Sequence, residues 1–159
     1  MIYIRVPISN IGSILVYEDD ELLFKIDRNF YFGFKITGKI FEKDKKIAVV
    51  TNSFLSIKLL YQDLGNNIEI LSSNFPFYSK FKIEENTIKV IDNPLYFIYP
   101  KIYSYIFWNN KLIAKVGLNK LIDIYGAELQ VKFISKNCHR DVRYYVVLIY
   151  LMTCINLNV

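Results

Sequence analysis

The sequence has little of the chemistry on which most enzyme and metal sites depend. Its 159 residues include one histidine, His139, and two cysteines, Cys138 and Cys154. One histidine and two distant cysteines cannot make a zinc site without several carboxylates. A catalytic pair of Cys138 and His139 is disfavoured too, because adjacent residues on a helix point about 100° apart. We therefore predict a protein that is not an enzyme, with no catalytic, cofactor-binding or metal-binding residues.

Signals for nucleotide binding and for export are also missing. The chain contains neither a GxGxxG nor a P-loop pattern, and it does not open on a basic segment followed by an apolar stretch and a cleavage site. Aromatic residues interleaved with lysines occur in nucleic-acid stacking platforms, but here they run through the whole chain, which is typical of a barrel wall. We expect a cytoplasmic protein with free thiols, no cofactor and no nucleic-acid partner.

Alanine, the best helix former, occurs only three times, whereas tyrosine occurs 13 times and phenylalanine 12 times. Tyr, Phe, Ile and Val fit a pleated, half-buried surface, so the composition favours β-structure. Hydrophobic residues make up 53% of the chain, which is enough for a large core. The length is that of one domain, and we treat residues 1–159 as a single unit.

Short runs of branched and aromatic residues recur from end to end, separated by polar connectors such as Glu84–Asn86 and Asn109–Asn110. These connectors predict antiparallel hairpins. The predicted strands are 2–6, 13–17, 22–26, 31–36, 39–42, 47–52, 57–62, 68–72, 78–84, 87–92, 96–99, 102–108, 111–117 and 127–134. So many strands in one small domain favour a barrel or sandwich, which limits exposed sheet edges.

The end of the chain is different, because residues 144–154 are almost entirely apolar. Ser135 or Asn137 is positioned to cap a helix here, and such a helix lies in protein or in lipid. A helix over 144–159 is about 24 Å long, short of the roughly 30 Å hydrocarbon thickness, so we expect a buried core helix and no transmembrane span. A strand stays open because Val146, Val147 and Ile149 are branched, but the length of the run favours a helix.

The formal net charge of +5 lies entirely in the last third, since eight basic residues from Lys101 onward face three acidic ones. Such an excess attracts anionic surfaces, whereas its even spacing also fits an ordinary solvated surface. The candidate anion-binding residues are Lys111, Lys115, Lys120, Arg140 and Arg143.

Three segments carry a resemblance to a known family: residues 39–58, 105–116 and 127–134, the last leading into the terminal helix. In this order they resemble the tubby C-terminal-like superfamily, which includes LURP-one-related proteins and phospholipid scramblases. The resemblance implies a closed antiparallel barrel of about twelve strands around a buried hydrophobic C-terminal helix. It also implies a binding or membrane-associated role, since tubby-like domains bind phosphoinositide head groups.

Three functional hypotheses follow. The first is a non-enzymatic binding or scaffold domain that associates with anionic membrane lipid, cytoplasmic and peripheral at the membrane. The alternative is an accessory or immunity protein of bacterial type that binds another protein through an exposed aromatic patch. A third class, a lipocalin-like ligand carrier, requires an open barrel interior, which a helix inside the barrel would remove.

Overall fold

The computed structural model describes residues 1–7, 12–31, 35–53, 56–65, 68–74, 78–93, 102–123, 126–135 and 138–153. These residues form twelve strands and one helix. The elements are β1 (Ile2–Pro7), β2 (Ile14–Glu18), β3 (Glu21–Tyr31), β4 (Lys35–Glu42), β5 (Lys45–Ser53), β6 (Ser56–Gln62), β7 (Ile68–Asn74), β8 (Tyr78–Ile83), β9 (Asn86–Asp92), β10 (Ser104–Trp108), β11 (Lys111–Asp123), β12 (Gly126–Phe133) and α1 (Arg140–Thr153). The predicted mainly β fold of about twelve strands with one C-terminal helix is confirmed.

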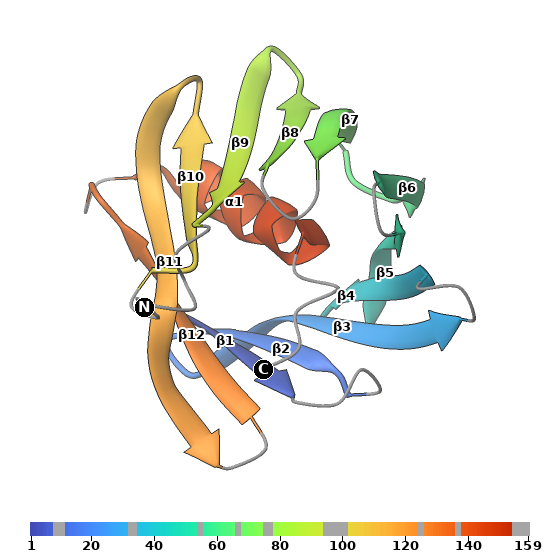
Figure 1. Ribbon diagram of the computed structural model, residues 1–159, viewed down its shortest axis with the longest axis vertical. Coiled ribbons are helices and arrows are strands. Elements are labelled where there is room, and N and C mark those ends of the chain that lie inside the picture. The colour runs from blue at the N-terminus through green and yellow to red at the C-terminus, as the bar shows by residue number, and fades with distance from the viewer. Residues whose placement is uncertain are drawn as a thin grey trace.

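The strands form one antiparallel sheet in which each is bonded to its neighbours in the chain, except that β6 and β7 are not bonded to each other (Figure 1). The first and last strands also pair, with Ile2, Ile4 and Val6 opposite residues of β12. This pairing turns the sheet into an up-and-down barrel that is open only between β6 and β7, the two ends of the sheet order. We call the gap between β6 and β7 the seam.

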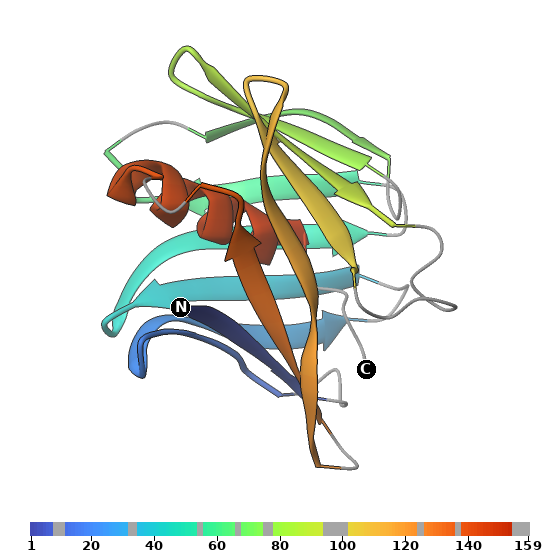
Figure 2. The same cartoon turned by 90° about the vertical axis from the view of Figure 1, so that its left-hand side faces the viewer.

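Helix α1 fills the interior of the barrel. Both views place it between β8–β11 on one side and β1–β5 on the other (Figures 1 and 2). Residues 146–152 of the helix are each at most 1% exposed, and they share one core with alternate residues of the strands. A helix that is apolar all round is stable only when surrounded, so the prediction of a buried core helix is confirmed. In the part of the chain described, no helix combines the length and the apolar run needed to cross a bilayer.

Two predicted strands need correction. A single strand over 31–36 is wrong, because β3 ends at Tyr31, β4 begins at Lys35 and these two residues are paired across the hairpin. The only turn-forming residue in the sequence between them is Gly33, which stands among aromatic residues and was interpreted as a bend or bulge within a strand. Strand β11 continues to Asp123, beyond the predicted 111–117. The predicted strand 96–99 lies outside the described residues.

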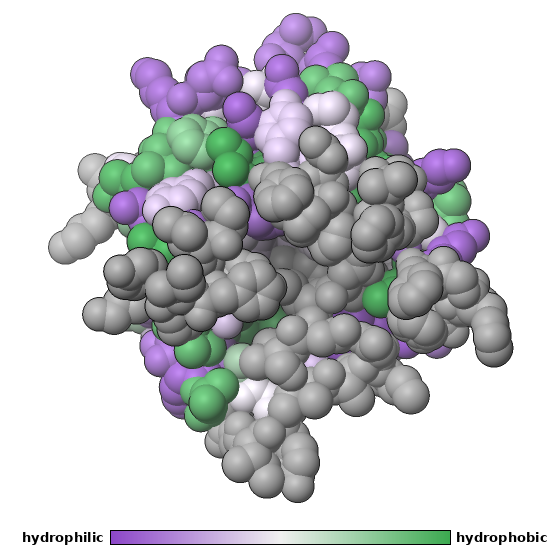
Figure 3. Space-filling model, viewed as in Figure 1, coloured by the Kyte–Doolittle hydropathy of each residue, from purple (hydrophilic) through white to green (hydrophobic). Residues whose placement is uncertain are grey.

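The antiparallel order places the connections after β2, β4, β6, β8, β10 and β12 at one end of the barrel, which we call the rim. In three of these turns both central residues have positive φ, between 45° and 70°, which is the type I′ geometry that matches the strand twist. Helix α1 starts at the rim, because it follows β12. The tips of the β8–β9 and β10–β11 hairpins form a hydrophilic area at the top of Figure 3.

At the seam, where β6 and β7 are not paired through their backbones, the side chain of Gln62 forms hydrogen bonds between the two strands. The backbone N–H of Ile68 on β7 donates to Gln62 Oε1 at 2.9 Å, and Gln62 Nε2 donates weakly to the Ile68 carbonyl at 3.5 Å. A carboxamide carries the same donor and acceptor as a peptide group, so Gln62 replaces one backbone pair between β6 and β7. Ile68 is 3% exposed, so its N–H has little access to water without this partner.

Replacing Gln62 by Ala is therefore expected to lower the free energy of unfolding by about 1–3 kcal/mol, the usual cost of leaving a buried backbone donor unpaired. Gln62→Glu keeps the acceptor for Ile68 and should cost less. Urea unfolding followed by circular dichroism measures both variants. Gln130→Ala is the matched control, because Gln130 donates only to the sulfur of Met1. Equal stability of Gln62→Ala and wild type would show that the seam does not depend on this contact.

Candidate functional site

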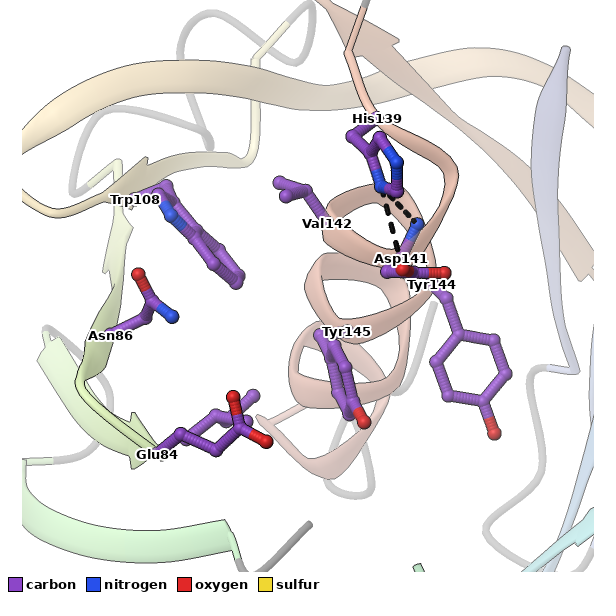
Figure 4. Close-up of a pocket in the computed structure, with 9 residues that line it drawn as sticks. Glu84, Asn86, Trp108, His139, Asp141, Val142, Tyr144 and Tyr145 are labelled. Carbon is purple, nitrogen blue, oxygen red and sulfur yellow. Dashed lines mark hydrogen bonds and ion pairs between the residues drawn. The ribbon is translucent and has the colours of Figure 1, made fainter. Parts of the chain in front are cut away.

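An open pocket of about 610 Å³ lies at the rim, between the start of α1 and the β8–β10 strands. This volume is within the range of small-molecule sites. Figure 4 shows the two sides facing each other across the space. The strand side contributes Ile83, Glu84, Asn86 and Trp108, and the helix side contributes His139, Asp141, Val142, Tyr144 and Tyr145. We call these nine residues the rim pocket.

His139 caps the helix. Its carbonyl accepts from the N–H of Arg143 at 3.1 Å, which closes the first helical turn, and its ring Nδ1 lies 3.4 Å from both the backbone nitrogen and the carboxylate Oδ2 of Asp141. A side chain that accepts from the second residue after it is the usual N-cap arrangement. Of the two predicted caps, Ser135 lies outside α1 and Asn137 lies outside the described residues. The single histidine thus has a structural role at the pocket wall.

Asn86 has an orientation that the surrounding bonds determine. The Thr87 N–H donates to Asn109 Oδ1 at 2.8 Å, which fixes the Asn109 oxygen because a backbone N–H can only donate. Asn109 Nδ2 then donates to Asn86 Oδ1 at 2.9 Å, which fixes the second amide in turn. The remaining group of Asn86, its Nδ2 donor, points into the rim pocket (Figure 4).

The charge of the rim pocket is negative. Glu84 and Asp141 supply two carboxylates, of which Asp141 Oδ2 lies 3.4 Å from His139 Nδ1, and among the described residues the lining includes neither lysine nor arginine. Both carboxylates are exposed, so they act through water and their individual attraction for a cation is modest. Asp141 also lies in the first turn of α1, where its charge offsets the positive end of the helix dipole.

The aromatic residues of the pocket differ in direction. Trp108 and Tyr145 face the open space from opposite sides (Figure 4). Tyr144 points away from it, toward Glu42, to which its hydroxyl donates at 3.1 Å. Burial, together with the nearby Glu42 carboxylate, raises the pKa of Tyr144 well above its usual value, so this hydroxyl is a donor and not a base.

The structure does not bring the five predicted anion-binding residues together. Lys111 and Lys120 are nine positions apart on β11, or about 30 Å along a strand. Lys111 and Arg140 are exposed and belong to the rim, where no described carboxylate forms an ion pair with either. Lys115 lies on the outer face, 5.9 Å from the centre of the Tyr105 ring. Anion binding by these residues stays a prediction.

The other two are already paired. Arg143 forms an ion pair with Glu18 and lies over the Phe133 ring at 5.3 Å. Lys120 lies 3.7 Å from Glu128, which also accepts from Arg5 Nε at 3.1 Å and from Asn119 Nδ2 at 2.8 Å. These partners already occupy the charged groups of Arg143 and Lys120, so both side chains are less available to a ligand. 

Within the described ranges, His, Cys, Asp and Glu side chains form no group suited to a metal ion. Burial raises the pKa of Cys138, and the charge of Arg143 only partly opposes this, so the thiolate needed for nucleophilic chemistry is disfavoured.

Comparison of the chain with protein-family models, with curated proteins and with solved structures gives no match in any of the three. The similarity to the tubby C-terminal-like superfamily therefore stays a prediction.

The sequence did not single out the rim pocket. Its strand side comes from the 84–86 connector and from the ends of the predicted strands 78–84 and 102–108, and its helix side comes from residues at the start of the predicted helix. The missing step was topological: in an up-and-down barrel of even strand number, the turns after β8 and β10 lie at the same end as the start of a helix that follows β12.

Glu128 gives a pH-dependent prediction. Its side chain is 5% exposed, and although burial raises the pKa, the hydrogen bonds from Asn119 and Arg5 and the charges of Lys120 and Arg5 outweigh it and lower the pKa overall. A folded-state pKa below the unfolded one stabilises the fold at neutral pH, and this stabilisation is lost as the pH falls through the folded-state value. Glu128→Gln should therefore cost about 1–3 kcal/mol at neutral pH and show a flatter acid limb.

Urea unfolding of wild type and Glu128→Gln over a series of acidic and neutral pH values measures this. The exposed Glu21 serves as control, and Glu21→Gln should follow the wild-type curve. Parallel curves for wild type and Glu128→Gln would contradict the prediction.

Proposed function

We propose that this chain is a non-enzymatic binding domain and that the rim pocket is its binding site. The carrying observation is that α1 fills the barrel while an open pocket remains beside the start of the same helix. A filled interior argues against a lipocalin-like carrier, so a ligand has to bind at the surface. The capping role of His139 and the raised pKa of Cys138 argue against catalysis at this place.

Ligand binding should raise the midpoint of thermal unfolding, because a ligand that binds only the folded state stabilises it. The probe is the small-molecule filtrate of an extract of the host cells. Val142→Phe, which extends a half-buried side chain at the pocket, should abolish the shift, whereas the conservative Val142→Ile should keep it. No shift with filtrate or with the vesicles described next would overturn the proposal.

A more specific version of the proposed binding function is association with anionic membrane lipid. It is supported by Lys111 and Arg140, two exposed cations at the rim. Phosphatidylserine vesicles at low salt should then co-sediment the protein more than phosphatidylcholine vesicles, and a Lys111→Glu, Arg140→Glu double variant should remove the preference. Equal sedimentation by both vesicles would exclude the lipid form without excluding a small ligand. The peripheral, cytoplasmic location belongs to the same proposal.

The seam favours a second candidate, the recognition of a partner protein. Strands β6 and β7 are the two ends of the sheet that do not pair with each other. Leu60 on β6 is 61% exposed, and Leu71 on β7 is 42% exposed. A groove of about 550 Å³ runs between the two strands. Exposed edge groups with apolar neighbours suit an extended segment of another chain, added as a strand.

A partner isolated from the host should accordingly slow amide exchange in 56–62 and 68–74 and leave the rim turns unchanged. Leu60→Lys, a charged edge substitution at an exposed position, should weaken that complex. Protection confined to other strands would exclude the seam as the interface.

A further inference from the structure

We propose that the rim pocket binds a small organic cation, an ammonium group with a neighbouring hydroxyl or carbonyl oxygen, for which choline is a simple probe. This inference rests on the proposed function, since it names the ligand class of the same pocket. Three features of the lining support it: the sign of its charge, its aromatic walls and the direction of one amide.

The charge of the lining selects a cation. Glu84 and Asp141 are acidic, and among the described residues no lysine or arginine lines the pocket. Arg140 and Arg143 are next to lining residues on α1, and Lys111 follows the β10–β11 turn, but none of the three is part of the lining. An anion in this space would face two carboxylates, whereas a cation is attracted by both.

The walls suit a cation that is poorly hydrated. Trp108 and Tyr145 lie on opposite sides of the space (Figure 4). The faces of tryptophan and tyrosine rings attract ammonium groups, and tryptophan is the strongest of the aromatic side chains in this respect. Aromatic walls with carboxylates at the edge are the arrangement by which proteins recognise quaternary ammonium ions.

Asn86 defines the second half of the ligand. Its oxygen is occupied by Asn109, so the Nδ2 group is what it presents to the pocket. This donor would repel a bare ammonium group but bonds an oxygen acceptor next to it. An amino alcohol satisfies both demands, with the ammonium group near the carboxylates and the oxygen at Asn86.

The chain carries its own reporter, because Trp108 is its only tryptophan. Choline should change the tryptophan fluorescence in a saturable way at low salt, and added salt should weaken the binding. The uncharged isostere 3,3-dimethyl-1-butanol should bind about tenfold more weakly, and inorganic phosphate should produce no change. Equal binding of choline and its uncharged isostere would overturn the proposal.

A variant pair separates charge from folding. Glu84 has a φ of 53° and Lys43 a φ of 45°, a region that asparagine tolerates better than either residue. Glu84→Asn should keep or raise the unfolding midpoint and weaken choline binding about two- to fivefold, as expected for the loss of one exposed carboxylate of two. Lys43→Asn relieves the same strain at a turn outside the pocket and should leave choline binding unchanged.

The outcomes distinguish this inference from the proposed function. If the host filtrate stabilises the protein through the rim pocket but choline does not bind, the cation is wrong and the binding site stands. If Glu84→Asn binds choline as wild type does, the carboxylate does not select the ligand and the inference fails. If neither filtrate nor vesicles nor choline binds, both proposals fail.

Discussion

The structure depends on one constraint: an apolar helix has to be enclosed. Residues 146–152 have no polar face to present to water, and they are stable only inside a wall of apolar side chains. Twelve strands provide that wall, since a sheet can surround a helix only if it is long enough to curl around it. The same helix contributes most of the filling of the interior, so neither part is a stable core without the other.

Enclosure also accounts for the unusual way in which the barrel closes. The two ends of the sheet do not meet as a ladder but leave a seam, which Gln62 bridges at one point. A complete ladder between β6 and β7 would tighten the wall, and the space for α1 is set by the circumference. The Gln62 bridge holds β6 and β7 near each other at one point without fixing the distance between them along their whole length. It also leaves backbone groups of two strands available, which is the physical basis of the second candidate function.

Much of the fold could be predicted from the sequence because its signals are local. The two hairpins were predicted correctly from the polar connectors at 84–86 and 109–110. The buried helix was predicted correctly from the length of the apolar run that begins at Tyr144. The strand at 31–36 was wrong because the single Gly33 among aromatic residues was interpreted as a bend within a strand and not as a turn between two strands. The rim pocket was missed because it joins β8–β10 to the start of α1, and such contacts depend on which end each turn occupies. The direction of a side chain such as Asn86 is harder still to predict from the sequence, because it is determined by a series of hydrogen bonds that begins at the backbone N–H of Thr87.

The charge distribution shows that an excess of basic residues in the sequence does not by itself make a basic binding site. The basic residues of the last third give the chain its net charge of +5, yet the six of them that the structure describes belong to β11, β12 and the first turn of α1, which direct them to different places. Arg143 is paired with Glu18, Lys120 with Glu128, and Lys115 lies against Tyr105. The pocket at the rim has the opposite sign, because its charges come from a hairpin turn and from the helix start. Net charge governs how a protein approaches a charged surface at long range, but the few side chains that line a pocket decide what enters it.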